Sequence, residues 1–414
     1  MLKPRVRTGT KPRRIVTTSH TSAMVDRAMD RDSERNDEPG TAGSREEARV
    51  STLELFFDLV FVFTITQLTS VLAHDPDGVG VLRVGLMLIV IWWMYGGYAW
   101  LTNVVAPDRL AYQLLLLGGM AAFLVISLAI PTAFGSGGLA FGLAYLVVIL
   151  IHAGLFTRSQ AGGSAMAILK VAPLNLVAAL AIVVAGIVGG TARDVLWGVA
   201  VAVIILPSLR PPDPRFEIAP GHFVERHGLV VIVALGESVV AVGIGASGHA
   251  LTAGLVAVAV MGLALTASLW WAYFGEGEDD RALQAMRSAT PRQRPRLALN
   301  GFYHWHLLIL FGIIALASAL ESAIAHPADP LSFARSLALA GGVACFLVGD
   351  ALFRRTLSIG ATRWRLTAAG LALATIPLGP EASAVVQVAA LVALLLACLV
   401  MELDGRRRAV AASA

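Results

Sequence analysis

The sequence predicts an all-α polytopic membrane protein with about twelve transmembrane helices, arranged as two parallel six-helix repeats. Two observations predict this class. Of the 414 residues, 57% are hydrophobic and only 14% are charged, whereas soluble domains carry about 25% charged residues. Apolar stretches long enough to cross a bilayer also recur from residue 52 to the C-terminus. The lipid bilayer is therefore the first expected partner of the chain.

The N-terminal segment, residues 1–50, differs from the rest of the chain. It contains no aromatic residue and mixes charges of both signs with Ser, Thr and Pro. Such a composition cannot bury enough apolar surface to fold, so we expect a disordered cytoplasmic tail. Ser51 and Glu54 then have the spacing of a capping box, which predicts that the first helix begins at residue 52.

Twelve apolar spans follow this start signal. We expect residues 51–209 to form the first six-helix half and residues 210–403 the second, with residues 404–414 as a cytoplasmic C-terminal tail. Spans six and eleven are short because Pro207 and Pro377 truncate them. The expected spans are 52–73, 81–102, 110–130, 138–157, 167–188, 193–209, 225–245, 251–274, 297–320, 332–353, 364–379 and 382–402.

The distribution of basic residues sets the orientation. With both termini in the cytoplasm, 29 of the 32 Lys and Arg residues fall on the cytoplasmic side. The positive-inside rule therefore predicts a multi-pass protein of the bacterial inner membrane. The basic residues flank the spans and form no single surface, so we expect no nucleic-acid partner despite the net charge of +4. The three residues left on the outer side are Arg83, Arg193 and Arg335.

An internal repeat is predicted from paired tryptophans, which occupy positions 92–93 of span two and 270–271 of span eight. Each pair follows a span that opens with a glutamate, Glu54 or Glu225. Because six spans separate the copies, the two halves would be related by an axis along the membrane normal. The alternative is that the tryptophans are independent anchors at the membrane surface.

Glu237 is the residue that most strongly suggests a function. It lies near the middle of an apolar run, residues 228–245, with Ser238 beside it. A charged group at that depth costs about 3 kcal/mol or more on insertion scales, and such groups often mark ion or proton pathways. We therefore expect Glu237 and Ser238 to contact a substrate or handle a proton. The alternative is a neutral glutamic acid that hydrogen-bonds between helices.

Span one carries a second set of polar residues. Glu54 and Asp58 are four residues apart and share one face of the helix. Asp58 either belongs to the ion-binding site or is stabilised by the helix N-terminus and a loop arginine. Gln67 lies near the middle of the membrane, where it can hydrogen-bond to a neighbouring helix. Glu54 and Glu225 are expected to have structural roles at helix ends.

Span nine contributes two histidines, His304 and His306. Side chains two positions apart on a helix point in directions that differ by about 200°, so His304 and His306 cannot both face one metal ion. One of them is a candidate proton relay with a carboxylate, and a hydrogen-bonded core histidine is the alternative. We expect no metal, no cofactor and no catalytic residue.

Two of these segments resemble a known family. The segment Glu54–Phe63, with the sequence ELFFDLVFVF, and the segment Phe223–Ser238, with the sequence FVERHGLVVIVALGES, are similar to the two signatures of the bacterial low temperature requirement A family (LtrA). The resemblance covers roughly residues 51–403. It implies a polytopic membrane protein with no established substrate and no enzymatic activity. On this resemblance the motif residues are Glu54, Asp58, Glu225, His227 and Glu237.

A second likeness concerns span one alone. The segment Phe56–Thr66 is similar to the FSD signature of a lysosomal and bacterial potassium-channel family that is built from six-helix repeats. In this chain Phe57 stands where that signature has serine, and Leu229 stands where the second half would need an aspartate. These departures argue against channel activity.

Three functional hypotheses follow. The leading one is a transporter of a small solute or ion with Glu237 at its site, helped by Asp58, Gln67 and a histidine of span nine. The alternative is a cation channel with span one lining the pore. An intramembrane lipid-modifying enzyme would need a metal or nucleophile cluster that the sequence does not provide, so we expect no enzymatic activity. Self-association into a homo-oligomer is left open.

Overall fold

The expectation of an all-helical chain is confirmed. The computed structural model describes residues 50–104, 109–158 and 162–413, and it contains no strand among them. Most of the predicted tail, residues 1–49, lies outside the described residues. The helices are α2 (Thr52–His74), α3 (Gly78–Val104), α4 (Leu110–Ala129), α5 (Gly138–Arg158), α6 (Gly162–Ile187), α7 (Gly190–Ser208), α8 (Pro220–Ala246), α9 (Ala253–Phe274), α10 (Glu278–Ser288), α11 (Arg294–Leu297), the π-helical segment η3 (Ala298–Trp305), α12 (His306–Ala325), α13 (Phe333–Leu357), α14 (Arg363–Ala374), α15 (Leu378–Glu381) and α16 (Ala384–Ser413), with short 3₁₀ turns η1 (Ile130–Thr132) and η2 (Gly275–Gly277).

Helix α2 begins where the capping box predicts. The Ser51 hydroxyl accepts a hydrogen bond from the Glu54 backbone N–H at 3.3 Å, and the Glu54 carboxylate accepts one from the Ser51 backbone N–H at 2.9 Å. Two backbone donors that the first helical turn would leave free are thereby satisfied. The cap also fixes the position of Glu54 at the start of the helix.

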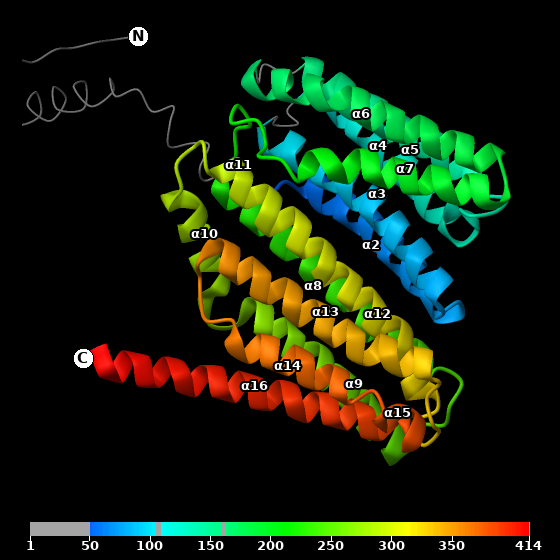
Figure 1. Ribbon diagram of the computed structural model, residues 1–414, viewed down its shortest axis with the longest axis vertical. Coiled ribbons are helices and arrows are strands. Elements are labelled where there is room, and N and C mark those ends of the chain that lie inside the picture. Colours follow the sequence, from blue (N-terminus) through cyan, green and yellow to red (C-terminus); the bar gives the residue numbers. More distant parts are fainter. Residues whose placement is uncertain (1–49, 105–108, 159–161, 414) are drawn as a thin grey trace, which may run out of the picture. The chain divides into compact units, whose positions relative to one another are not determined.

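The helices run alongside one another in a bundle (Figure 1). Helices α4–α7 group on one side of it, and α9, α13, α14 and α16 group on the other. Helices α8 and α12 lie between these groups, and both contact α2. Because α2 belongs to the predicted first half and α8 to the second, their contact joins the two halves.

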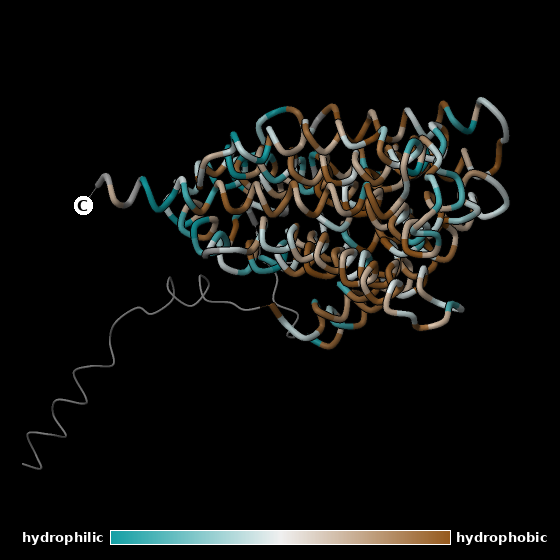
Figure 2. Tube along the Cα trace, turned by 90° about the horizontal axis from the view of Figure 1, so that it is seen from below, coloured by the Kyte–Doolittle hydropathy of each residue, from teal (hydrophilic) through white to brown (hydrophobic). Residues whose placement is uncertain are grey.

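Ten helical segments among the described residues are long and apolar enough to cross a membrane. The two expected spans missing from this set are the short ones, which correspond to α7 and α14. Both pack beside neighbouring helices, α7 against α6 and α14 against α13. Because these two helices fall outside the ten candidate spans, the number of twelve crossings remains a prediction. Along the bundle, the hydrophobic residues concentrate in the middle and the hydrophilic ones toward the ends (Figure 2).

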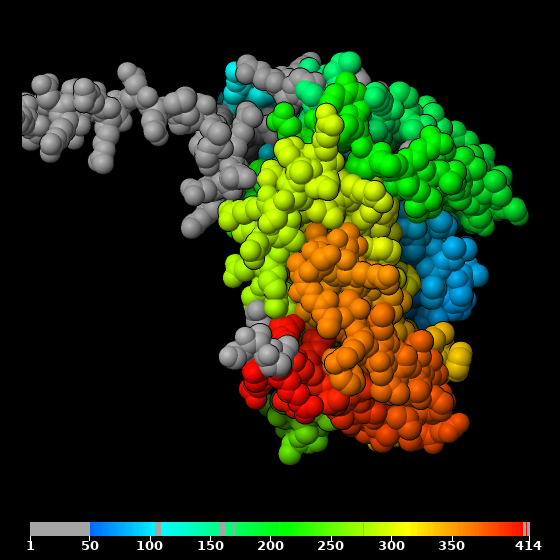
Figure 3. Space-filling model, turned by 60° about the vertical axis from the view of Figure 1, so that its left-hand side comes forward, coloured from blue at the N-terminus to red at the C-terminus, as the bar shows by residue number. Residues whose placement is uncertain are grey.

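The expected C-terminal tail forms the end of helix α16. Helix α16 continues through residues 404–413 without a break. Figure 3 shows this helix beside α14 on one face of the molecule, with α10 farther along the same face. The continuation brings the last turns of α16 next to α10, where a buried ion cluster forms.

Helix α12 is the central element. The segment that contains it is 72% buried, the largest fraction among the ten candidate spans, and α13 follows at 67%. The two helices meet at glycines: a Cβ atom added to Gly312 would lie 2.6 Å from the Phe346 backbone nitrogen. A Cβ atom on Gly342 would lie 2.5 Å from the Leu316 nitrogen. Small residues therefore let the two backbones touch, as is common between membrane helices.

Candidate functional site at the α2–α8 interface

Four ionisable side chains meet where α2 contacts α8. We call Glu54, Asp58, His222 and Arg226 the α2–α8 cluster; each is at most 4% exposed. Arg226 donates to Glu54 Oε1 at 2.7 Å and to Asp58 Oδ1 at 3.3 Å. One guanidinium of α8 thus holds both carboxylates of α2, which explains why these acids share one helix face.

Aromatic rings and one histidine complete the surroundings of the α2–α8 cluster. His222 Nε2 lies 2.8 Å from Glu54 Oε1, and the Tyr95 hydroxyl donates to Asp58 Oδ1 at 2.8 Å. The guanidinium carbon of Arg226 lies 5.5 Å from the ring centroids of both Phe57 and Tyr95. Cation–π attraction adds to the ion pairs at such distances.

The carboxylates of the α2–α8 cluster outnumber its permanent cation. Glu54 and Asp58 face one guanidinium, that of Arg226, which keeps its charge at any ordinary pH. Asp58 Oδ2 is buried and has no hydrogen-bond partner among the described residues. An uncompensated buried charge is costly, and neutralisation by a proton or a cation relieves that cost. The α2–α8 cluster can therefore take up one positive charge.

Glu237 lies deeper along the same interface. It is 4% exposed, and its carboxylate accepts a hydrogen bond from the Thr66 hydroxyl of α2 at 2.7 Å. Ser238 is fully buried, and its hydroxyl has no hydrogen-bond partner in the described part of the chain. Gln67 is half-buried, and its side chain makes no hydrogen bond to any residue that the structure describes. The partner that sequence reasoning overlooked is Thr66, although a hydroxyl in an apolar span was the available signal.

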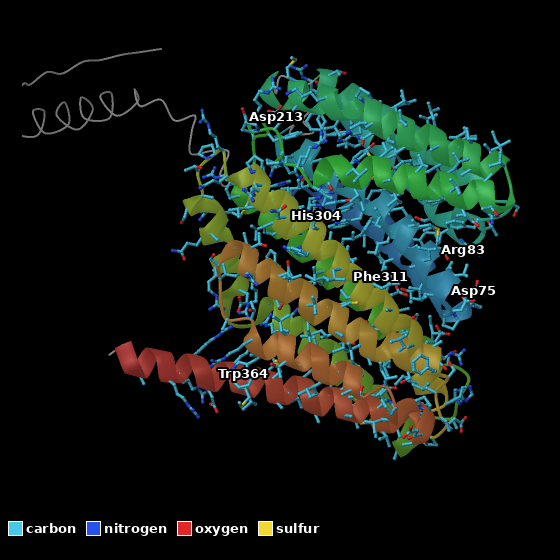
Figure 4. All side chains as sticks on the ribbon, in the orientation of Figure 1. Asp75, Arg83, Asp213, His304, Phe311 and Trp364 are labelled. Carbon is cyan, nitrogen blue, oxygen red and sulfur yellow. The ribbon has the colours of Figure 1, made fainter. Side chains whose placement is uncertain are left out.

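The two histidines of span nine point to different neighbours. His304 Nε2 lies 3.1 Å from the Ser208 hydroxyl at the end of α7, whereas His306 Nε2 lies 2.7 Å from the Tyr273 hydroxyl of α9. His306 Nδ1 is 3.0 Å from the Gly301 carbonyl oxygen, five residues earlier in the chain. Neither histidine contacts a carboxylate of the α2–α8 interface. Figure 4 labels His304, on the segment that leads into α12.

His227 of α8 packs its ring against that of His306, one of the span-nine histidines. It is buried, and its ring centroid lies 5.6 Å from that of His306. Its Nδ1 atom lies 2.8 Å from the Phe223 carbonyl oxygen one turn earlier in α8. Within the described residues, no group of three or more His, Cys, Asp or Glu side chains is arranged to hold a metal ion.

The residues that suggested a repeat lie in different surroundings. Glu54 is buried, whereas Glu225 is exposed. Likewise Trp92 is fully buried, whereas Trp270 and Trp271 are 42% and 47% exposed. A repeated arrangement of the two halves therefore remains a prediction.

A second group of buried charges was not predicted. We call Glu278, Asp350, Arg354, Arg365 and Glu402 the α13–α16 cluster; these residues come from α10, α13, α14 and α16 and are all buried. Arg365 pairs with Asp350 and donates to Glu402 at 2.9 Å. Arg354 pairs with Glu278 and lies 3.5 Å from Glu402. Sequence spacing alone could not reveal these four pairs because each of them joins two different helices.

Comparison with known proteins agrees with the signatures on α2 and α8. A family profile described as bacterial low temperature requirement A protein (LtrA) matches residues 49–401. An uncharacterized protein of Rhizobium meliloti (strain 1021) is 29% identical over 327 residues, which cover 76% of this chain and 79% of that protein. No solved structure matches the chain. The family profile covers most of the chain, and many of its helices can cross a bilayer. The chain is therefore a multi-pass membrane protein that belongs to the bacterial low temperature requirement A family.

Proposed function

We propose that this protein is a carrier that moves a small solute or ion across the bacterial inner membrane. The buried carboxylates of the α2–α8 interface would be its ion-coupling groups. The observation that carries the proposal is the distribution of acids on one interface: Arg226 holds Glu54 and Asp58 near one end, and Thr66 holds Glu237 deeper. Ionisable residues inside membrane spans are costly, and they commonly mark ion or proton pathways.

The proposed orientation follows from the basic residues. With both termini in the cytoplasm, the α2–α8 cluster lies toward the cytoplasmic side. Glu237 comes eleven residues after Arg226, which corresponds to roughly 16 Å along a helix. The interface would thus offer two binding sites for a proton or cation at different depths, the α2–α8 cluster and Glu237. The bilayer and a small solute or ion are the proposed partners, and the proposal requires neither covalent chemistry nor a cofactor.

Charge at this interface can control the contact between the two halves. When Glu237 is protonated or binds a cation, its interaction with Thr66 of α2 changes. If Asp58 is neutralised, Arg226 compensates the negative charge of Glu54 alone. Because α2 and α8 belong to different halves, occupancy of either carboxylate alters how the halves pack. Carriers commonly alternate access by rocking one half against the other around a site between them.

The packing around α2 favours a carrier over a channel. Channel selectivity commonly relies on charged side chains or carbonyls that face a continuous water path. In this chain Asp58 is 3% exposed, and the buried rings of Phe57 and Phe61 lie on the same helix. Single-channel recording in planar bilayers separates the two functions, because channel currents far exceed the turnover of a carrier. Unitary currents would favour the channel.

The main test measures proton flux in proteoliposomes. Purified protein is reconstituted with a trapped pH-sensitive dye, and a potassium diffusion potential drives proton entry. We expect Glu237→Gln to lower the protein-dependent flux at least tenfold, because the amide cannot take up a proton. The matched control is Glu225→Gln, since Glu225 lies on the same helix but is exposed.

Three outcomes would contradict this proposal. The first is a flux in Glu237→Gln equal to that of the unchanged protein. The second is a wild-type flux no higher than that of protein-free liposomes. The third is loss of flux in both variants, because the effect would then not depend on burial. Size-exclusion profiles of all three proteins exclude misfolding as the cause.

A further inference from the structure

A cavity of about 730 Å³ lies away from the carboxylates of the α2–α8 interface. It is bounded by α3, α5, α6, η3, the start of α8 and the connection that leads from α7 to α8. Its volume falls within the range of about 300–1,000 Å³ that is typical of small-molecule sites. No carboxylate of the α2–α8 cluster lines it, and neither does Glu237. Five aromatic side chains form much of the wall: Trp93, Trp100, Phe216, Phe223 and Tyr303.

Exposure changes along the wall of this cavity. Tyr303, Asn175 and His152 are buried, whereas Lys170 and Arg210 are exposed. The apolar and aromatic surface is therefore inside, and the basic groups stand where the cavity reaches the surface. Asn175 accepts a hydrogen bond from Trp93 Nε1 at 2.8 Å, so its carbonyl oxygen is already satisfied. A long apolar group can consequently enter without leaving that buried acceptor unpaired.

The charges at the mouth leave one arginine available. Arg215 and Lys170 both donate to Asp213, at 2.7 and 2.9 Å. These two hydrogen bonds hold the pKa of Asp213 well below its usual range, so its carboxylate stays ionised and compensated. Arg210 makes no hydrogen bond or ion pair with any residue that the structure describes. Figure 4 shows Asp213 at the end of the bundle opposite Asp75.

We propose that this cavity binds a single-chain amphiphile with an anionic head group. The apolar chain would lie among the aromatic rings, which removes its apolar surface from water. The carboxylate or phosphate head would lie at the mouth and accept hydrogen bonds from Arg210. A cationic amphiphile would be repelled at the same place. This inference concerns binding alone and does not depend on transport.

The chain-binding part is tested with tritiated palmitate on purified full-length protein in detergent, with free and bound ligand separated by rapid gel filtration. Val171→Trp fills the cavity from α6, because Val171 is part of its wall. The matched control is Val177→Trp, on the same helix but outside the wall and 49% exposed. We expect Val171→Trp to reduce palmitate binding at least tenfold and Val177→Trp to leave it unchanged. Equal binding by the two variants would overturn the proposal.

The head-group part is tested by removing the charge on either partner. We expect Arg210→Ala to weaken palmitate binding about tenfold, because a charge-assisted hydrogen bond is lost. Hexadecanol, which has the same chain but no charge, should bind both proteins equally. The matched control is Arg292→Ala, another exposed arginine that is not part of the wall. Equal affinity of unchanged protein for palmitate and hexadecanol would overturn the anionic head.

Competition identifies the source of the amphiphile. Unlabelled palmitoyl-lysophosphatidate and unlabelled palmitate are each titrated against the bound tritiated palmitate. Stronger competition by lysophosphatidate supports a lipid phosphate head, and stronger competition by palmitate supports a free fatty acid. Failure of both to compete would show nonspecific partition and overturn the site.

Discussion

The two buried ion clusters differ in charge balance. In the α2–α8 cluster one arginine faces two carboxylates, whereas in the α13–α16 cluster two arginines face three. Two partly exposed arginines, Arg281 and Arg406, also donate to Glu278, at 2.6 and 2.8 Å. With them, four arginines face the three carboxylates, so the cations of the second cluster outnumber its acids. Each cluster contains a carboxylate oxygen without a partner among the described residues, on Asp58 and on Glu278. Charge balance, and not burial, therefore distinguishes a candidate coupling site from a structural ion cluster.

The largest expected effect comes from removing the shared arginine of the α2–α8 cluster. Arg226→Met leaves Glu54 and Asp58 buried without their cationic partner. Removing one partner of a buried ion pair costs about 3–5 kcal/mol, because the remaining charge is uncompensated. We expect a marked loss of thermal stability, measured by tryptophan fluorescence in detergent. A melting temperature equal to that of the unchanged protein would show that Arg226 does not hold the interface.

The corresponding change in the α13–α16 cluster should cost less. In Arg354→Met, Glu278 still has Arg281 and Arg406, and Glu402 still has Arg365. Because each acid keeps a cation, we expect about 1–3 kcal/mol of destabilisation in the same assay. If Arg354→Met proved as damaging as Arg226→Met, the difference in charge balance would have no energetic consequence.

The smallest effect is expected where a substitution removes the excess charge. Asp58→Asn keeps an acceptor for the Tyr95 hydroxyl and leaves one carboxylate, that of Glu54, facing the Arg226 guanidinium. We therefore expect a stability within about 1 kcal/mol of the unchanged protein, or higher. Asp350→Asn, the matched change in the other cluster, should lose about 1–3 kcal/mol because Arg365 loses a charged partner. Comparable destabilisation by the two substitutions would contradict an excess negative charge at Asp58.

Much of the helical architecture could be predicted from the sequence. Apolar length and the capping box gave helix starts close to those observed, as at Thr52. The helix α10 was missed because its charged residues look like a loop between spans, although its amphipathic spacing was a usable signal. The π-helical segment η3 was also missed, since local sequence does not distinguish i→i+5 from i→i+4 hydrogen bonding.

The candidate site was only partly predictable. Glu237 and Asp58 stood out because a carboxylate in an apolar run violates the composition around it. Arg226 lies 168 residues away from Asp58 in the sequence, and Thr66 lies 171 residues away from Glu237. Only the packing of α2 against α8 brings them together. Arg226 was counted among the basic residues on the cytoplasmic side, and its burial became visible only in the assembled bundle.

The glycine contact between α12 and α13 limits how the bundle can change shape. Where two backbones touch at Gly312 and Gly342, sliding or separation would open a gap that no side chain is long enough to refill. These two helices should therefore travel as one rigid body through any working cycle. Relative movement would then occur between this pair and the helices around it. Disulfides introduced between α12 and α13 should therefore form without lowering the flux measured in proteoliposomes.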